Sequence, residues 1–276
     1  MKNNLALIAV LSFTMISSFT FAQKESKKKH ENHYRKQAPV ETDVYKIKIE
    51  DAHSQAKFTS IRITVTNKTS DFLIFKPSEI VFKYDHGDYN VEEKEIRIKP
   101  KGSVTRSLKT SGGKEFHVKN MSIVVNCLYL LSIDEEGIAA PDFDLPASVD
   151  NFKAGGFEVS LKKLVKKTDE TVASFSVVNA GNDYAIVTNG KSTVKLEDDR
   201  EFLTSDSNRV NAKILNPGDE MNLTVIYKVP VSITDMQFAN MKIIWKNTFS
   251  ESTAVKLAGH TFKLEIDPGL TMGKNN

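Results

Sequence analysis

The chain has 276 residues, and its 38 Lys and Arg against 35 Asp and Glu give a formal net charge of only +3. Nothing in this balance suggests the strongly basic surface on which nucleic-acid binding depends, so a nucleic-acid partner is not expected. The single cysteine excludes an intramolecular disulfide, so the fold must be held by burial of a core.

Residues 1–22 are predicted to be a cleaved secretory signal peptide. Lys2 supplies the positive n-region, Leu5 to Ile16 the apolar h-region, and Thr20-Phe21-Ala22 the small residues at the cleavage site. The apolar run is shorter than the roughly 20 residues of a membrane span, which favours cleavage over an uncleaved anchor helix. Gln23, and not a cysteine, would follow the cleavage site, so a lipid anchor is not expected. Export without disulfides is typical of a bacterial envelope, which predicts a periplasmic or extracellular location.

Residues 23–42 are predicted to be a disordered basic tail. The stretch 24–36 is almost free of apolar residues and cannot offset its ordering entropy by burial. Its basic residues are Lys24, Lys27, Lys28, Lys29, Arg35 and Lys36, against Glu25 and Glu31. A solubilising spacer is the favoured interpretation. The alternative is contact with an acidic surface such as phospholipid headgroups, anionic glycans or nucleic acid.

From residue 43 onward, apolar and polar residues alternate with the period of two that is typical of β-strands. In residues 43–133 the apolar positions are Tyr45, Ile47, Ile49, Ile61, Ile63, Val65, Ile96 and Ile98. In residues 157–267 they are Phe157, Val159, Leu161, Met221, Leu223, Val225, Tyr227, Phe262, Leu264 and Ile266. Strands of this kind have one buried and one solvated face, so an all-β antiparallel fold is expected.

The two halves of this β region resemble each other. Residues 61–67 align with 173–179, Lys99-Pro100 aligns with Asn216-Pro217, and residues 120–125 align with 240–245. Three matches in the same order indicate a duplicated unit of about 85–95 residues, the size of an immunoglobulin-like sandwich. We therefore expect one such domain at 43–133 and a second at 157–267.

Residues 134–156 are predicted to be the linker between the two domains. Glycine and proline bracket this stretch, while Phe143, Leu145 and Phe152 give it enough apolar content to pack as a semi-rigid joint. Residues 268–276 are predicted to be a C-terminal tail.

The second repeat also carries a recognisable order of motifs. Val177-Val178-Asn179 ends one strand, the loop Leu215-Asn216-Pro217-Gly218-Asp219-Glu220 follows, and a later strand ends in Val229-Pro230. This order resembles the immunoglobulin-like domains of unknown function in bacterial exported and lipid-anchored proteins. The resemblance covers residues 157–249 and extends weakly to 44–131, where Lys99-Pro100-Lys101-Gly102 contains an insertion. It implies a fold and an envelope location, but no activity.

Several residues are candidates for catalytic or metal-binding groups. Cys127 lies in a strand-like run with no base marked as its partner, so a buried core cysteine is favoured over a nucleophile. His30 and His33 are close in the predicted tail and could pick up copper or zinc. No paired His or Cys spacing supports a structural zinc site, and no metal site is predicted.

Acidic and aromatic residues are also candidates for a binding site. The carboxylates of residues 197–206 lack the glycine of a calcium loop, so a solvated hairpin is favoured, and the same interpretation suits Asp85, His86 and Asp88. Asp142 and Asp144 form a carboxylate pair without a companion in the predicted linker. Trp245 is expected at the centre of a core. Tyr84, Tyr89 and Tyr184 fit either a contact surface or ordinary loop packing.

The sequence thus predicts a non-catalytic exported protein that acts as a protein-interaction or scaffold module. No catalytic or cofactor-binding residue is predicted, because no phosphate-binding loop, nucleophile elbow or Ser-His-Asp order is present. The partner would be another envelope protein or a surface polymer. A carbohydrate- or wall-binding module is the alternative, and it would need exposed, coplanar aromatic side chains on one face. The third hypothesis, and the least favoured, is an enzyme with an unrecognised site. A pocket with convergent polar residues would support this hypothesis.

Overall fold

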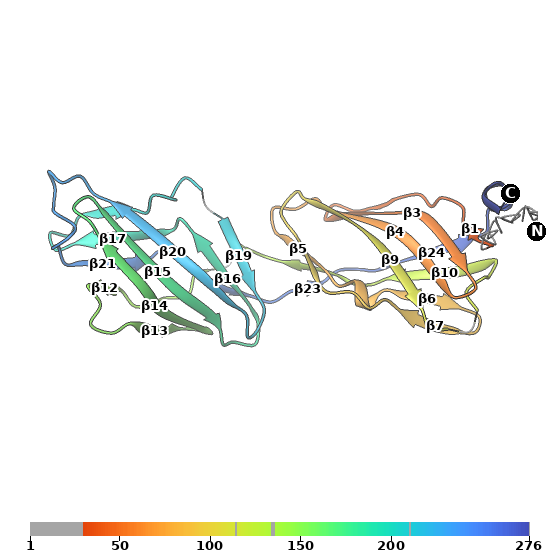
Figure 1. Cartoon of the computed structure of the whole chain (residues 1–276), viewed down its shortest axis with the longest axis horizontal. Coiled ribbons are helices and arrows are strands. Elements are labelled where there is room, and N and C mark those ends of the chain that lie inside the picture. Colours follow the sequence, from red (N-terminus) through yellow and green to blue (C-terminus); the bar gives the residue numbers. More distant parts are fainter. Residues whose placement is uncertain (1–29, 114, 134–135, 210, 276) are drawn as a thin grey trace, which may run out of the picture.

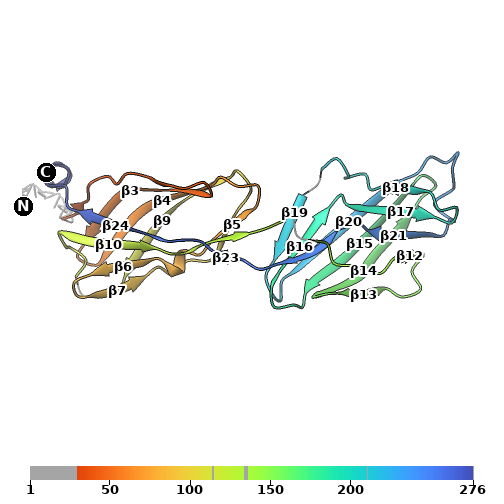
Figure 2. The same ribbon diagram turned by 180° about the vertical axis from the view of Figure 1, so that it is seen from behind.

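The computed structural model describes residues 30–113, 115–133, 136–209 and 211–275. These residues are almost all β, with one short helix, α1 (Pro268–Asn275), and this confirms the predicted all-β class. None of the helices in the described ranges is long and apolar enough to span a membrane. The predicted signal peptide lies outside these ranges. Figures 1 and 2 show an elongated molecule in which two groups of strands, here called the first and second lobes, lie end to end.

The first lobe contains three antiparallel sheets, in the orders β1-β3-β4-β9, β24-β10-β6-β7 and β23-β11-β5-β8, with β2 also paired to β3. Its strands are β1 (Asn32–His33), β2 (Val40–Glu41), β3 (Tyr45–Gln55), β4 (Phe58–Asn67), β5 (Phe72–Phe75), β6 (Val81–Tyr84), β7 (Gly87–Asn90), β8 (Ile96–Ile98), β9 (Ser103–Ser111), β10 (Asn120–Val125), β11 (Leu128–Leu131), β23 (Val255–Lys256) and β24 (His260–Glu265). A short 3-10 helix spans Pro77–Glu79.

The second lobe repeats this plan with sheets in the orders β13-β14-β15-β20, β12-β21-β17-β18 and β19-β16-β22. Its strands are β12 (Phe143–Leu145), β13 (Asn151–Ala154), β14 (Phe157–Lys166), β15 (Glu170–Asn179), β16 (Tyr184–Asn189), β17 (Ser192–Leu196), β18 (Glu201–Leu203), β19 (Asn211–Leu215), β20 (Glu220–Lys228), β21 (Met241–Trp245) and β22 (Phe249–Ser252).

Each lobe has its own hydrophobic core, formed by the apolar positions of the alternating strands. In the first lobe Ile61, Ile63 and Val65 of β4 are buried, and their neighbours on the strand are more exposed. In the second lobe Phe175 and Val177 of β15 are buried in a separate cluster. The period-two pattern therefore places one face of each central strand in a core, as the sequence predicts.

A third, smaller cluster joins the two lobes. Phe72, Ile74 and Leu131 of the first lobe pack with Ile186 and Ile214 of the second, and all five are buried. Each large apolar side chain removed from water contributes about 1.5–3 kcal/mol. This contact therefore holds the lobes together as more than a flexible tether.

Polar contacts reinforce this junction. Arg97 Nη1 donates to the carbonyl of Ile214 at 2.6 Å, and the Tyr184 hydroxyl donates to Glu95 Oε2 at 2.9 Å. Because these groups are partly buried, their hydrogen bonds restrict the angle between the lobes.

The basic tail differs from its prediction over residues 30–42. These residues form β1 and β2 on the edge of β3, and Tyr34 is buried with its hydroxyl bonded to Ser54 Oγ and the Val118 carbonyl, each at 2.9 Å. Composition alone does not predict this, because the pairing partners lie outside the stretch, in the next strand along the chain, β3.

The predicted linker and C-terminal tail differ as well. Within 134–156, β12 pairs with β21 and β13 pairs with β14, so both strands belong to the second lobe. Residues 260–265, expected in the second domain, form β24 and pair with β10 of the first lobe. In place of a tail, helix α1 packs against β1, where Thr271 and Asn275 hydrogen-bond to His33 and Glu31. Alternation predicts a strand but not the sheet that it joins.

Candidate functional site

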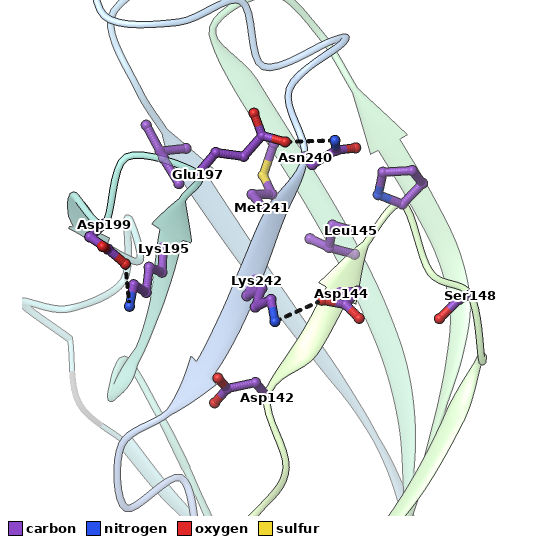
Figure 3. A pocket seen from close by; sticks show the side chains of 12 residues that line it. Asp142, Asp144, Leu145, Ser148, Lys195, Glu197, Asp199, Asn240, Met241 and Lys242 are labelled. Atoms are coloured by element: carbon purple, nitrogen blue, oxygen red, sulfur yellow. Dashed lines mark hydrogen bonds and ion pairs between the residues drawn. The ribbon is translucent and has the colours of Figure 1, made fainter.

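A cavity of about 520 Å³ lies at the outer end of the second lobe, where β12 ends, β17 ends and β21 begins (Figure 3). Its apolar floor is made by Leu145, Leu196 and Met241, three side chains that belong to the core of the lobe. Pro146, joined to Leu145 by a cis peptide bond, and Ser148 form one wall. The alternation of these strands thus sends apolar groups inward and polar groups to the cavity mouth.

Charged side chains form the mouth of this cavity. Lys195 Nζ lies 2.6 Å from Asp199 Oδ1, and Lys242 Nζ lies 3.6 Å from Asp144 Oδ1. Figure 3 shows both pairs at the cavity, with Asp142 beside them. Glu197 lines the same mouth and accepts a hydrogen bond from the Asn240 amide at 2.7 Å.

The charge of the mouth is negative overall, because four carboxylates face two lysines. The hydrogen bond and charge of Asp199, with Glu201 and Asp142 also contributing, raise the pKa of Lys195 above its usual value. Both cations are therefore already engaged by carboxylates. The excess of negative charge suits a cationic group from outside the chain.

Exposed apolar side chains lie in the loops that border the cavity. Val149 follows Ser148 and is 63% exposed, and Phe238 precedes Ala239 and Asn240 and is 76% exposed. Val231, in the same loop as Phe238, is 55% exposed. Large exposed apolar groups in loops that border a cavity are typical of an interaction surface. We call the cavity and these loops the distal surface.

The acidic residues of 197–206 lie in the turn between β17 and β18, in β18 itself and in the turn that follows, and several of them form ion pairs. Asp198 pairs with Arg200, Asp199 with Lys195, and Glu201 with Lys246. In the described part of the chain no three His, Cys, Asp or Glu side chains gather in a way that could hold a metal ion. The solvated hairpin is the interpretation that this geometry favours over a calcium loop.

Cys127 is buried in the first-lobe core, as the sequence analysis favoured. Its side chain is 1% exposed, and burial raises the pKa of the thiol to about 12. A thiol in this state is neutral at physiological pH, which makes it a poor nucleophile.

Four of the six histidines lie in two pairs in the first lobe. His30 Nδ1 is 2.8 Å from His117 Nε2, and the rings of His33 and His53 stack with centroids 5.8 Å apart. Burial lowers the pKa of both His33 and His117. The structure therefore brings His30 and His33, which are neighbours in sequence, to two different partners.

Most of the aromatic candidates are packing residues. Trp245 is 6% exposed, and its ring packs edge-on against Phe175 in the second core, where the sequence predicts it. Tyr84 is buried, and Tyr89 meets it at an interplanar angle of 72°. Tyr184 lies at the junction of the lobes. These rings do not form the coplanar strip that a carbohydrate platform would need.

No sequence pattern predicts the distal surface. Asp142 and Asp144 fall in the predicted linker, although the alternation of Phe143 and Leu145 around Asp144 is typical of a strand. Only the pairing of β12 with β21 brings these carboxylates beside Lys195 and Lys242.

Comparisons with known proteins give no family for this chain. No family model matches it, and no curated protein matches it. A solved structure of procruciferin, an 11S globulin from Brassica napus, aligns with 86% of this chain and 88% of its own at 9% identity and a TM-score of 0.14. A likeness this low gives no basis for transferring a fold or a function.

Proposed function

We propose that this chain is a non-catalytic protein of the cell envelope, exported by a cleaved signal peptide, that acts as a protein-interaction or scaffold module. Two tandem immunoglobulin-like sandwiches form its body. Support for the tandem arrangement comes from the two cores and from the matching strand orders of the lobes. In antibody variable domains, the binding loops lie together at one end of such a sandwich.

The observation that carries the proposal is the distal surface. It joins a cavity of about 520 Å³ and a negative mouth to the exposed ring of Phe238. Interaction surfaces combine an aromatic anchor with charged groups around it. The packed junction between the lobes would hold this end at a fixed distance from the other, as a scaffold requires.

The chemistry of the cavity indicates the kind of partner. A lysine or arginine of the partner would place its charged end among Asp142, Asp144 and Glu197. The partner we propose is therefore an envelope protein with a basic segment.

The experiment is affinity capture of residues 23–276 after crosslinking in native cells, followed by mass spectrometry. We expect a protein partner that is lost with Phe238→Ser and with Asp142→Asn/Asp144→Asn. Two matched controls should retain it: Val255→Ser, an exposed valine of the first lobe, and Glu158→Gln, an exposed carboxylate of the second lobe. Capture that these changes leave unaltered would contradict the assignment of the distal surface.

Carbohydrate or wall-polymer binding is the alternative. If capture yields no protein, binding of the same variants to glycan arrays and to isolated wall polymer is the next measurement. Binding there that depends on Asp142 and Asp144 would favour that alternative.

A further inference from the structure

Strands β12 and β24 occupy the same place in the two lobes. Phe143 and Leu145 of β12 pair with Ile243 and Met241 of β21. In the first lobe, β24 pairs with β10, the strand that corresponds to β21. Beyond β10 the sheet continues with the hairpin β6-β7, and beyond β21 it continues with the hairpin β17-β18. The two edge strands therefore complete equivalent sheets.

The residues of the two strands match as well. Phe262 and Leu264 of β24 pair with Ile123 and Met121 of β10, so each strand sets a Phe-x-Leu sequence against an Ile and a Met. All four residues of this first-lobe group are buried. The match extends through side-chain identity as well as backbone position.

The match continues upstream of each strand. The Ile138 amide donates to the Phe249 carbonyl at 2.8 Å, and the Leu257 amide donates to the Leu128 carbonyl at 2.9 Å. Phe249 and Leu128 begin the equivalent strands β22 and β11. The segments 138–145 and 257–264 are thus the same element of the repeat.

These two segments differ in where the chain supplies them. Residues 138–145 lead directly into the strands of the second lobe. Residues 255–275 come after the whole second lobe and return along the first, as Figures 1 and 2 show. Each segment leaves one lobe and completes the other, so the lobes are joined by a reciprocal exchange of strands.

The returning segment makes its strand pairs with the first lobe. β24 pairs with β10 over six residues, β23 pairs with β11, and α1 hydrogen-bonds to β1. The connection at Thr253 is exposed, and Ala254 is only partly buried. An identical segment from another molecule could therefore make every one of these pairs, with a change of conformation only in this connection.

We propose that the edge formed by β10 and β11 accepts residues 255–275 of a second copy of this chain, and that the protein assembles by exchange of its C-terminal strand. This edge needs a strand, because without one the backbone groups of β10 are unpaired and its Phe262 and Leu264 contacts are lost. The first lobe is synthesised before the segment that completes it, so its edge is open while the second lobe folds. A second copy supplies the same sequence at that stage.

Cysteine pairing across β10 tests the exchange. Ser122 lies between Lys263 of β24 on one side and Lys83 of β6 on the other, and all three are at least partly exposed. Two full-length chains with different tags are co-expressed with export, one carrying Ser122→Cys and the other Lys263→Cys, and then oxidised. The matched control pair carries Ser122→Cys and Lys83→Cys, because Lys83 lies within the first lobe and is not exchanged.

We expect disulfide-linked heterodimers carrying both tags, at about twice the mass of one chain, for the first pair and not for the control. The double variant Ser122→Cys/Lys263→Cys shows that the variants fold, because it closes a disulfide within one chain or between chains. The exchange is contradicted by two results together. The double variant forms its disulfide only within one chain, and the co-expressed pairs Ser122→Cys with Lys263→Cys and Ser122→Cys with Lys83→Cys give equal amounts of heterodimer or none.

Discussion

Asn67 and Asn179 hold the same place at the ends of β4 and β15 and make the same hydrogen bonds. The Asn67 amide donates to the carbonyls of Asp71 at 2.7 Å and Ile98 at 3.2 Å, while its oxygen accepts from the Thr69 amide at 2.9 Å. One buried side chain therefore fixes the turn after β4 and the end of β8.

The Asn179 amide donates to the carbonyls of Asp183 at 2.9 Å and Leu215 at 3.1 Å, and its oxygen accepts from the Gly181 amide at 3.0 Å. Both asparagines are 1% exposed. Two of the three partners stand at the same spacing from their asparagine, two and four residues later, and the third is the end of the equivalent strand, β8 or β19. This equivalence supports the duplication that the sequence predicts, since such a network is hard to match by chance.

Replacing either asparagine should destabilise its own lobe. Asn67→Ala and Asn179→Ala each leave buried carbonyls without a donor, at a cost of about 1–3 kcal/mol. Urea unfolding of each variant measures this. Asn90→Ala is the control, because Asn90 makes one exposed hydrogen bond to Ser78 and should change stability by less than about 0.5 kcal/mol. Equal losses in all three variants would show that the buried asparagines have no special role.

The exchange of edge strands predicts which lobe each phenylalanine stabilises. Phe262→Ala should cost about 3–5 kcal/mol and should do so in the first lobe, although Phe262 follows the second lobe in sequence. Hydrogen exchange should accelerate in β10 and β6, and not in β21 and β17. Phe143→Ala is the matched variant and should give the opposite pattern. Faster exchange in the second lobe of the Phe262 variant would refute this assignment.

Acid should destabilise the first lobe through His33. Burial is the largest cause that lowers the pKa of His33 below 6.5, with His53 and Lys274 acting in the same direction against Glu31. The unfolded chain therefore binds more protons than the folded one, and this contribution to stability is present above pH 6.5 and is lost as pH falls.

Urea unfolding at about pH 7.5 and about pH 5.5 measures this effect. His33→Gln should lose less stability between the two pH values than the unchanged chain. His86→Gln, a change at an exposed histidine, should follow the unchanged chain. A steeper loss of stability for His33→Gln than for the unchanged chain would mean that protonated His33 stabilises the folded chain, contrary to this account.

Cys127 should be inert in the folded protein. Because its pKa is raised to about 12, we expect no reaction with an aromatic disulfide reagent at neutral pH until the chain unfolds in urea. The aromatic thiolate that the reagent releases absorbs light, and its absorbance measures how much Cys127 has reacted. Rapid labelling of the folded chain would reveal a more accessible thiol than the structure has.

Local pattern predicted much of the fold but not its connections. The alternation of Ile61, Ile63 and Val65 gave both the strand and its buried face, because a strand's two faces follow from its own residues. The alternation of Phe262 and Leu264 also gave a strand, but it was placed in the wrong lobe. Sheet membership depends on partners that are distant in sequence, and pattern does not encode them.

The same limit explains the distal surface. Asp142 and Lys195 are far apart in sequence and meet only through the pairing of β12, β21 and β17. The exposure of Phe238 is likewise a property of the folded loop, since a phenylalanine is ordinarily expected inside. No sequence motif marks either the charged mouth of the cavity or the exposure of Phe238.

The most direct test of the proposed function places a photocrosslinking amino acid at Phe238 in cells that express the protein at its native level. The control has the same amino acid at Ser107, which is exposed on β9 of the first lobe and lies outside the segment 255–275. We predict that illumination links a protein with a basic segment to position 238, that position 107 does not capture it, and that Asp142→Asn/Asp144→Asn weakens the link. Equal capture at both positions, or no protein at position 238, would contradict the account.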